Sequence, residues 1–111
     1  RRALCFGQAG DRTDDLIREL ARDAWAIGLD HVFVSELAAY HRGREHGDVF
    51  GIIRDELLRQ GASDDQIRHN EEELETLEDA LAWARPGDLV IMLALGGAAP
   101  VHKRLRELGA Q

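Results

Sequence analysis

Apolar residues along this chain follow two alternating patterns. Short continuous apolar runs predict buried strands, and they occupy residues 3–7, 31–36 and 88–95. The run "DLVIMLAL" at 88–95 predicts the strongest strand, and a weaker run around Ile67 predicts a short strand near a sheet edge. Apolar residues at helical spacing predict four helices, over residues 14–27, 49–57, 71–84 and 101–108. The predicted order is therefore βαβαβαβα.

Strands that alternate with helices in this way are typical of a parallel sheet with right-handed crossovers and helices on both faces. We therefore expect an α/β fold, a three-layer Rossmann-like arrangement with a mostly parallel sheet of about four to five strands. In such sheets, ligands bind beyond the carboxyl ends of the strands. The loops expected at that edge are 7–13, 36–47 and 95–100.

Length and charge narrow the classes of function. A chain of 111 residues has the length of one domain, and 44% hydrophobic with 32% charged residues is ordinary for a globular protein. A net charge of -7 argues against a nucleic-acid surface, because phosphate binding needs clustered Lys and Arg. No run reaches the roughly 18 to 20 apolar residues of a membrane span, and no signal peptide is visible. A cytoplasmic protein without nucleic-acid or membrane partners is expected.

Candidate nucleophiles and metal ligands are few. The single cysteine, Cys5, excludes an internal disulfide and a cysteine-based zinc site, and its apolar surroundings predict a buried core thiol. His41 and His46 have no carboxylate or cysteine at ligand spacing, so we predict no metal site. No Ser-His-Asp or Cys-His set can be assembled.

The segment "GQAGDR" at 7–12 follows the first predicted strand. It lacks the Lys-Ser/Thr of a P-loop and the third glycine of a dinucleotide fingerprint. Asp11, Asp14 and Asp15 surround the expected helix start, where carboxylates interact favourably with the helix dipole but repel phosphate. The sequence favours a strand-to-helix turn. The alternative is that Arg12 projects toward a ligand held mainly by other groups.

The segment "ELAAYHRGREHGD" at 36–48 concentrates positive charge in an otherwise acidic chain. Arg42 and Arg44 flank Gly43, with His41 and His46 close by. Arginines on a loop at a strand end can bind the carboxylate of a small substrate or a nucleotide phosphate. The alternative is a solvated polar loop. The third loop, "ALGGAAP" at 94–100, either lets a ligand approach the backbone or simply turns the chain.

Two long segments carry a resemblance to one family. The stretch "FGQAGDRTDDLIRELARDAW" is similar to the start of the C-terminal domain of Mur-type ligases, where an apolar strand runs into a Gly-Gly-Asp-Arg turn. Residues 41–93, beginning "HRGREHGDVFGIIRDELL", resemble the matching region of cyanophycin synthetases and their relatives. There an Arg-Gly-Arg segment precedes a helix, and a Pro-Gly-Asp leads into the last strong strand. The resemblance spans nearly the whole chain.

This resemblance implies an ATP-dependent amide-forming ligase of three domains. The central domain of such enzymes carries the P-loop and the Mg²⁺ site and makes an acyl phosphate, which an incoming amino acid attacks. The C-terminal domain is Rossmann-like, closes over the central domain, helps to hold ATP and receives the amino acid. Residues 1–111 would be that C-terminal domain without its first strand, inactive alone. Its partners would be the upstream ATPase domain, which binds most of the ATP and Mg²⁺, and the amino acid.

The family's motifs carry over to two groups of residues. Those that match the Gly-Asp-Arg turn, on the ATP side and facing the central domain, are Gly10, Asp11 and Arg12. Those implied on the amino-acid side, in or beside the arginine loop, are Glu36, His41, Arg42 and Arg44.

The chain also departs from its apparent relatives. The Asn-Pro-Arg signature of some peptidoglycan tripeptide synthases is absent, and Ala38 and Ala39 stand where cyanophycin synthetases carry acidic residues. The resemblance therefore leaves the joined amino acid open. The alternative function is a non-enzymatic Rossmann-like module that binds a small molecule or a partner. A receiver-like signalling domain is disfavoured, because Lys103 falls on the last predicted helix and not after a strand.

Overall fold

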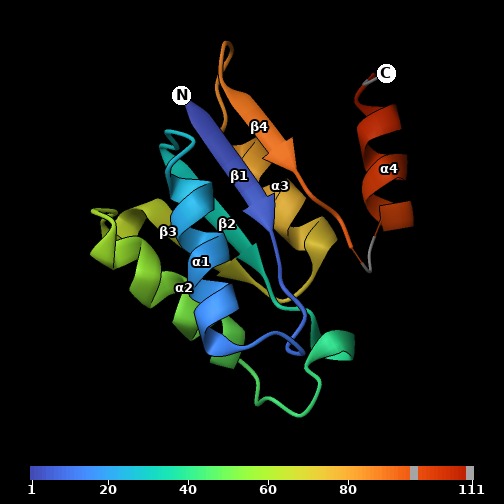
Figure 1. Cartoon of the computed structure of the whole chain (residues 1–111). Helices are drawn as coiled ribbons and strands as arrows, with labels where there is room; N and C mark the ends of the chain where they lie inside the picture. The colour runs from blue at the N-terminus through green and yellow to red at the C-terminus, as the bar shows by residue number, and fades with distance from the viewer. Residues whose placement is uncertain (96–97, 110–111) are drawn as a thin grey trace.

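The predicted alternation of strands and helices is confirmed by the computed structural model, which describes residues 1–95 and 98–109 (Figure 1). The strands are β1 (Arg2–Phe6), β2 (His31–Ser35), β3 (Ile67–Asn70) and β4 (Leu89–Met92). The helices are α1 (Asp14–Trp25), α2 (Asp48–Arg59), α3 (Glu73–Trp83) and α4 (Ala98–Glu107). Short 3-10 turns lie at Ala38–Tyr40 and Asp64–Gln66.

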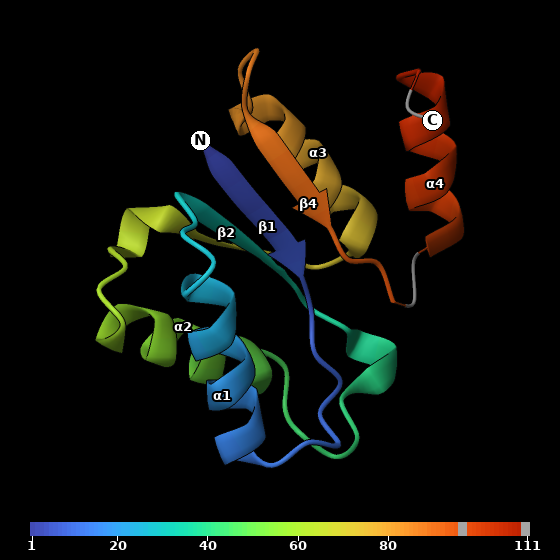
Figure 2. The ribbon, with the colours of Figure 1, turned by 45° about the horizontal axis from the view of Figure 1, so that its top comes forward.

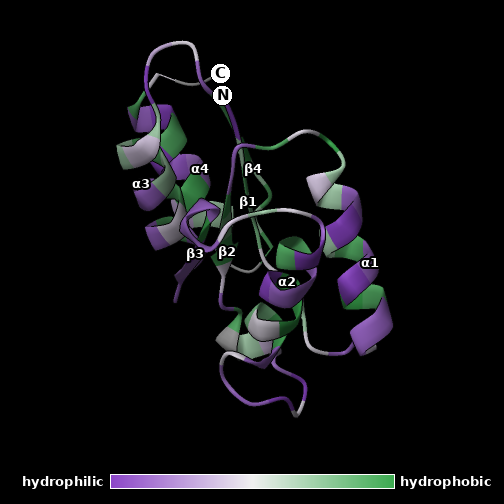
Figure 3. Ribbon diagram, turned by 90° about the vertical axis from the view of Figure 1, so that its left-hand side faces the viewer, coloured by the Kyte–Doolittle hydropathy of each residue, from purple (hydrophilic) through white to green (hydrophobic). Residues whose placement is uncertain are grey.

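All four strands are parallel and form one sheet in the order β3-β2-β1-β4. Helices α1 and α2 pack together on one face, while α3 covers the other face with α4 beside it, which gives three layers (Figure 3). The expected α/β, Rossmann-like class is confirmed. In the described part of the chain, no helix has the length and apolar character that crossing a bilayer requires.

Alternating side chains of the central strands fill two separate parts of the core. Leu4 of β1 lies in register with Val32 and Ile91, so aliphatic residues run across the sheet beneath α1 and α2. Cys5 faces the opposite side and packs with Phe33 near α3. Burial raises the pKa of the Cys5 thiol to about 12, and the prediction of a buried core thiol is confirmed.

The last strand is shorter than predicted. The run 88–95 predicted the strongest strand, yet β4 spans only Leu89–Met92 and lies at the sheet edge, partly exposed. Its single neighbour, β1, ends at Phe6, and the last bond between them runs from the Leu93 N–H to the Cys5 carbonyl. Among residues 1–95 and 98–109, no adjacent strand continues the pairing beyond that point. By contrast, β3 lies at the other edge, as predicted for the run around Ile67.

Strand order places a topological switch point between β1 and β4. The chain steps outward from β1 to β2 and β3, and then α3 carries it back across the sheet to the far side of β1 (Figure 2). The segments that follow β1 and β4 therefore leave the carboxyl ends of the strands toward opposite faces of the sheet. In this architecture, ligands bind in the crevice between two such segments. The loop predicted at 95–100 belongs to this edge, but its residues 96 and 97 lie outside the described residues.

Candidate functional site

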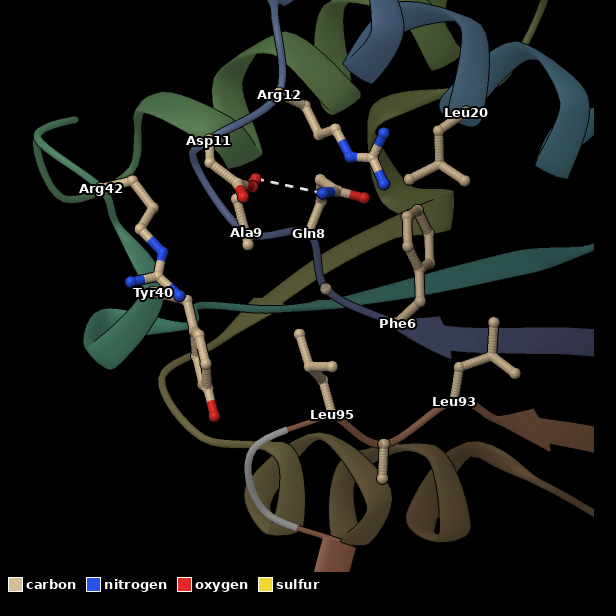
Figure 4. Close-up of a pocket in the computed structure, with 12 residues that line it drawn as sticks. Phe6, Gln8, Ala9, Asp11, Arg12, Leu20, Tyr40, Arg42, Leu93 and Leu95 are labelled. Atoms are coloured by element: carbon tan, nitrogen blue, oxygen red, sulfur yellow. Dashed lines mark hydrogen bonds between the residues drawn. The ribbon is translucent and has the colours of Figure 1, made fainter.

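A pocket of about 530 Å³ lies at this switch point, between the segments that follow β1, β2 and β4 (Figure 4). Its apolar wall comes from the end of β1, from α1 and from the segment after β4, and consists of Phe6, Leu20, Leu93, Ala94 and Leu95. Its polar wall comes from the loops after β1 and β2, and its side chains are Gln8, Asp11, Arg12, Tyr40 and Arg42. Three residues predicted for function, Asp11, Arg12 and Arg42, thus line one pocket.

Arg12 and Arg42 lie on different sides of the pocket mouth (Figure 4). Both are exposed, and among the described residues neither guanidinium has a hydrogen-bond or ion-pair partner. The Arg42 guanidinium lies 5.6 Å from the centre of the Tyr40 ring, a cation–π contact. Arg42 also has a φ of 54°, a left-handed conformation that costs a non-glycine residue about 1 kcal/mol or more. The pocket therefore offers two guanidinium groups to an anionic ligand.

Arg44 has a different environment from Arg42. Its half-buried guanidinium donates to the carbonyl oxygens of Gly10, at 3.0 Å, and Arg12, at 2.8 Å. It also pairs with Asp14 at 2.7 Å and Asp48 at 2.9 Å, and hydrogen bonds to these carboxylates raise its pKa. Because these bonds join the turn after β1 to the start of α2, the geometry favours a positioning role for Arg44 over direct ligand binding.

The Gly-Asp-Arg turn is shaped by its contact with the loop after β2. The Gly10 N–H donates to the Tyr40 carbonyl at 2.8 Å. A Cβ at Gly10 would overlap the carbonyl oxygen of His41, so glycine is required here for loop packing. The α1 N-cap is Thr13, whose hydroxyl accepts from the Leu16 N–H at 3.3 Å, rather than one of the nearby aspartates. These contacts support the strand-to-helix turn that the sequence favoured.

Glu36, directly after β2, holds the arginine loop at both ends. Its buried carboxylate accepts from the Gly47 N–H at 2.8 Å and lies 3.0 Å from His41 Nε2 and 2.7 Å from His69 Nε2. Burial alone would raise the pKa of Glu36, but the hydrogen bonds from Gly47 and His69 outweigh it and hold the pKa below its usual value. Glu36 and His41, both predicted ligand contacts, are therefore bonded to each other and position the loop that carries Arg42.

Histidines gather beside the Glu36 carboxylate. His46 Nε2 lies 2.8 Å from Glu71, and this hydrogen bond raises the pKa of His46. His69 stacks on Phe50 with ring centres 4.1 Å apart. Within residues 1–95 and 98–109, no group of three or more His, Cys, Asp or Glu side chains is placed to hold a metal ion.

Several site residues were not predicted from the sequence. Tyr40 and Leu95 line the pocket, and His69 binds Glu36 from the neighbouring strand. Tyr40 beside two arginines was a signal that could have been used, since aromatic rings often pack against guanidinium groups. For His69 no local signal existed, because its role follows from the pairing of β3 with β2, which sets it opposite Val34.

Comparisons of the sequence with known protein families and with curated proteins found no match. We therefore infer the function from the fold, the pocket and the sequence motifs.

Proposed function

We propose that this chain is the C-terminal, Rossmann-like domain of an ATP-dependent amino-acid ligase of the Mur type, related to cyanophycin synthetases. The observation that carries the proposal is the pair of guanidinium groups, Arg12 and Arg42, at the mouth of one switch-point pocket without hydrogen-bond or ion-pair partners among the described residues. The Gly-Asp-Arg turn and the Arg-Gly-Arg loop, which carry the family resemblance, are the segments that supply these two side chains.

In this proposal each guanidinium binds a different anion. Arg42, on the amino-acid side, pairs with the carboxylate of the incoming amino acid, for which its planar fork of N–H donors is suited. Arg12, on the ATP side, faces the central domain and stabilises negative charge that develops during phosphoryl transfer. The amino-acid nitrogen then attacks the acyl phosphate, the carbon–oxygen bond to phosphate breaks, and the nitrogen loses a proton as the amide forms.

ATP and Mg²⁺ are assigned mainly to the central domain. Magnesium prefers oxygen ligands, and Asp11 supplies the one carboxylate among the described residues that line the pocket. The guanidinium of Arg12 suits phosphate oxygens but not a cation. This chemistry fits a domain that closes over a nucleotide held elsewhere, in a cytoplasmic enzyme supplied with ATP.

The proposal is tested by assaying the full-length gene product that contains this chain for ADP release that depends on an added amino acid. We expect Arg12→Ala to lower kcat by about tenfold or more, because it removes charge stabilisation from the phosphoryl-transfer step. Arg85→Ala is the matched control, since Arg85 is also exposed but lies between α3 and β4, at the amino ends of the strands and away from the pocket. Absence of amino-acid-dependent ADP release with every proteinogenic amino acid would contradict the ligase function.

A non-enzymatic binding module is the second candidate. It is favoured by the fact that segments of this chain alone build the pocket. The same assay distinguishes the two, because a binding module would take up an anionic ligand without any ADP release.

A further inference from the structure

We infer that the switch-point pocket selects an anionic ligand with an apolar or aromatic body and excludes one with a basic side chain. The inference deepens the proposed function and rests on it, since it names the class of amino acid that the pocket would receive.

The apolar wall of the pocket includes two leucines whose side chains are exposed to solvent. Leu93 and Leu95, in the segment that follows β4, are each 56% exposed. They lie beside Phe6 and Leu20 in the lining of the same pocket. Removing apolar surface from water stabilises a complex roughly in proportion to the area buried. A hydrocarbon or aryl group that covered these leucines would therefore favour binding.

The position of Tyr40 links this apolar wall to the anion-binding side chain. Its ring lies next to the Arg42 guanidinium and projects from that side of the mouth toward the side that holds Leu95 (Figure 4). A carboxylate paired with Arg42 would therefore place the atoms next to it against the ring and the leucine. The two parts of the site thus demand a charged head and an apolar body on one molecule.

Electrostatics disfavour a basic side chain in the same place. Arg12 and Arg42 contribute two positive charges to the lining, and Asp11 contributes one negative charge. An ammonium or guanidinium on the ligand's side chain would meet this positive excess and would also be desolvated against leucine. Two further carboxylates, Glu19 and Asp23, belong to an adjoining groove that shares Arg12 and lies along α1, outside the lining of the pocket.

Binding of four small probes to this chain, followed by NMR titration, tests the inference. N-acetyl-L-phenylalanine carries both required parts, its amide lacks the charge, acetate lacks the body, and N-acetyl-L-arginine replaces the body with a base. We expect N-acetyl-L-phenylalanine to bind about tenfold more tightly than each of the others. Leu95→Asn should weaken its binding about fivefold and leave acetate unchanged, whereas Leu89→Asn, 53% exposed at the other end of β4, should change neither.

The possible results separate the inference from the proposed function. If acetate or N-acetyl-L-arginine binds as tightly as N-acetyl-L-phenylalanine, the selectivity is wrong while anion binding stands. If the neutral amide binds as tightly as the acid, the charge requirement is wrong. If no anion binds, or if Arg42→Ala leaves the binding of every anion unchanged, the role of the pocket in the proposed function fails as well.

Discussion

Replacing Glu36 by glutamine should destabilise the protein, because this carboxylate holds the arginine loop. Glu36 is 5% exposed, and its carboxylate receives hydrogen bonds from the Gly47 N–H and from the rings of His41 and His69. A glutamine amide keeps one acceptor oxygen but turns an N–H₂ group toward at least one former donor. Hydrogen bonds to buried charged groups contribute about 1.5–3 kcal/mol each, so a loss of about 3 kcal/mol in the free energy of unfolding is expected.

Acid titration gives this prediction a second, independent readout. The pKa of folded Glu36 lies below its ordinary value of 4.5, so its contribution to stability is complete above pH 4.5. That contribution is lost as the pH falls through the folded pKa. Stability of the native protein should therefore fall more steeply below pH 4.5 than that of Glu36→Gln, which has no proton to bind at this position.

Urea unfolding at pH 7 and at pH 4, followed by tryptophan fluorescence and circular dichroism, measures both effects. Glu71→Gln is the control, because Glu71 also bonds to a histidine but is exposed, and we expect a loss below about 1 kcal/mol. If Glu36→Gln unfolds within about 0.5 kcal/mol of the native protein and keeps its acid dependence, Glu36 does not hold the arginine loop.

Further predictions concern the turn, the thiol and an exposed histidine. Gly10→Ala should destabilise the protein by at least about 2 kcal/mol in urea unfolding because its Cβ meets a backbone carbonyl, whereas Gly51→Ala, with open space in α2, should be neutral or stabilising. Cys5, with its pKa raised to about 12, should react with a thiol reagent only as fast as the protein unfolds; faster labelling would contradict its burial. NMR should show His46 titrating above its ordinary 6.5, so that its pairing stabilises the fold at low pH and is lost as the pH rises; an unchanged midpoint in Glu71→Gln would refute that pair.

Element order could be predicted from the sequence because periodicity reports burial directly. The runs that became β1 and β2 are buried on both faces of the sheet, and their continuous apolar character follows from that position. The same pattern at 88–95 predicted too long a strand, because hydrophobicity does not specify how many neighbours a strand has or where its pairing ends. The β4 strand is apolar yet lies at an edge, and the residues that follow it, 93–95, form part of the pocket wall.

The candidate site was predicted in part. Arg12 and Arg42 were identified from local charge and turn signals, and both line the pocket. The distinction between Arg42 and Arg44 depends on a contact between loops more than thirty residues apart, where the Gly10 carbonyl accepts from Arg44. Alternation and spacing contain no information on such contacts. For the same reason the partners of Glu36 became visible only in the folded chain.

The central claim is that Arg42 binds the carboxylate of the amino acid that a ligase containing this domain joins. The most direct test measures the amino-acid dependence of ADP release by the full-length gene product carrying Arg42→Ala, with Arg85→Ala as the exposed control. Loss of a bidentate carboxylate pair should raise KM for the amino acid by about tenfold or more and leave KM for ATP within about twofold. An unchanged KM for the amino acid, or an equal rise in both variants, would contradict the claim.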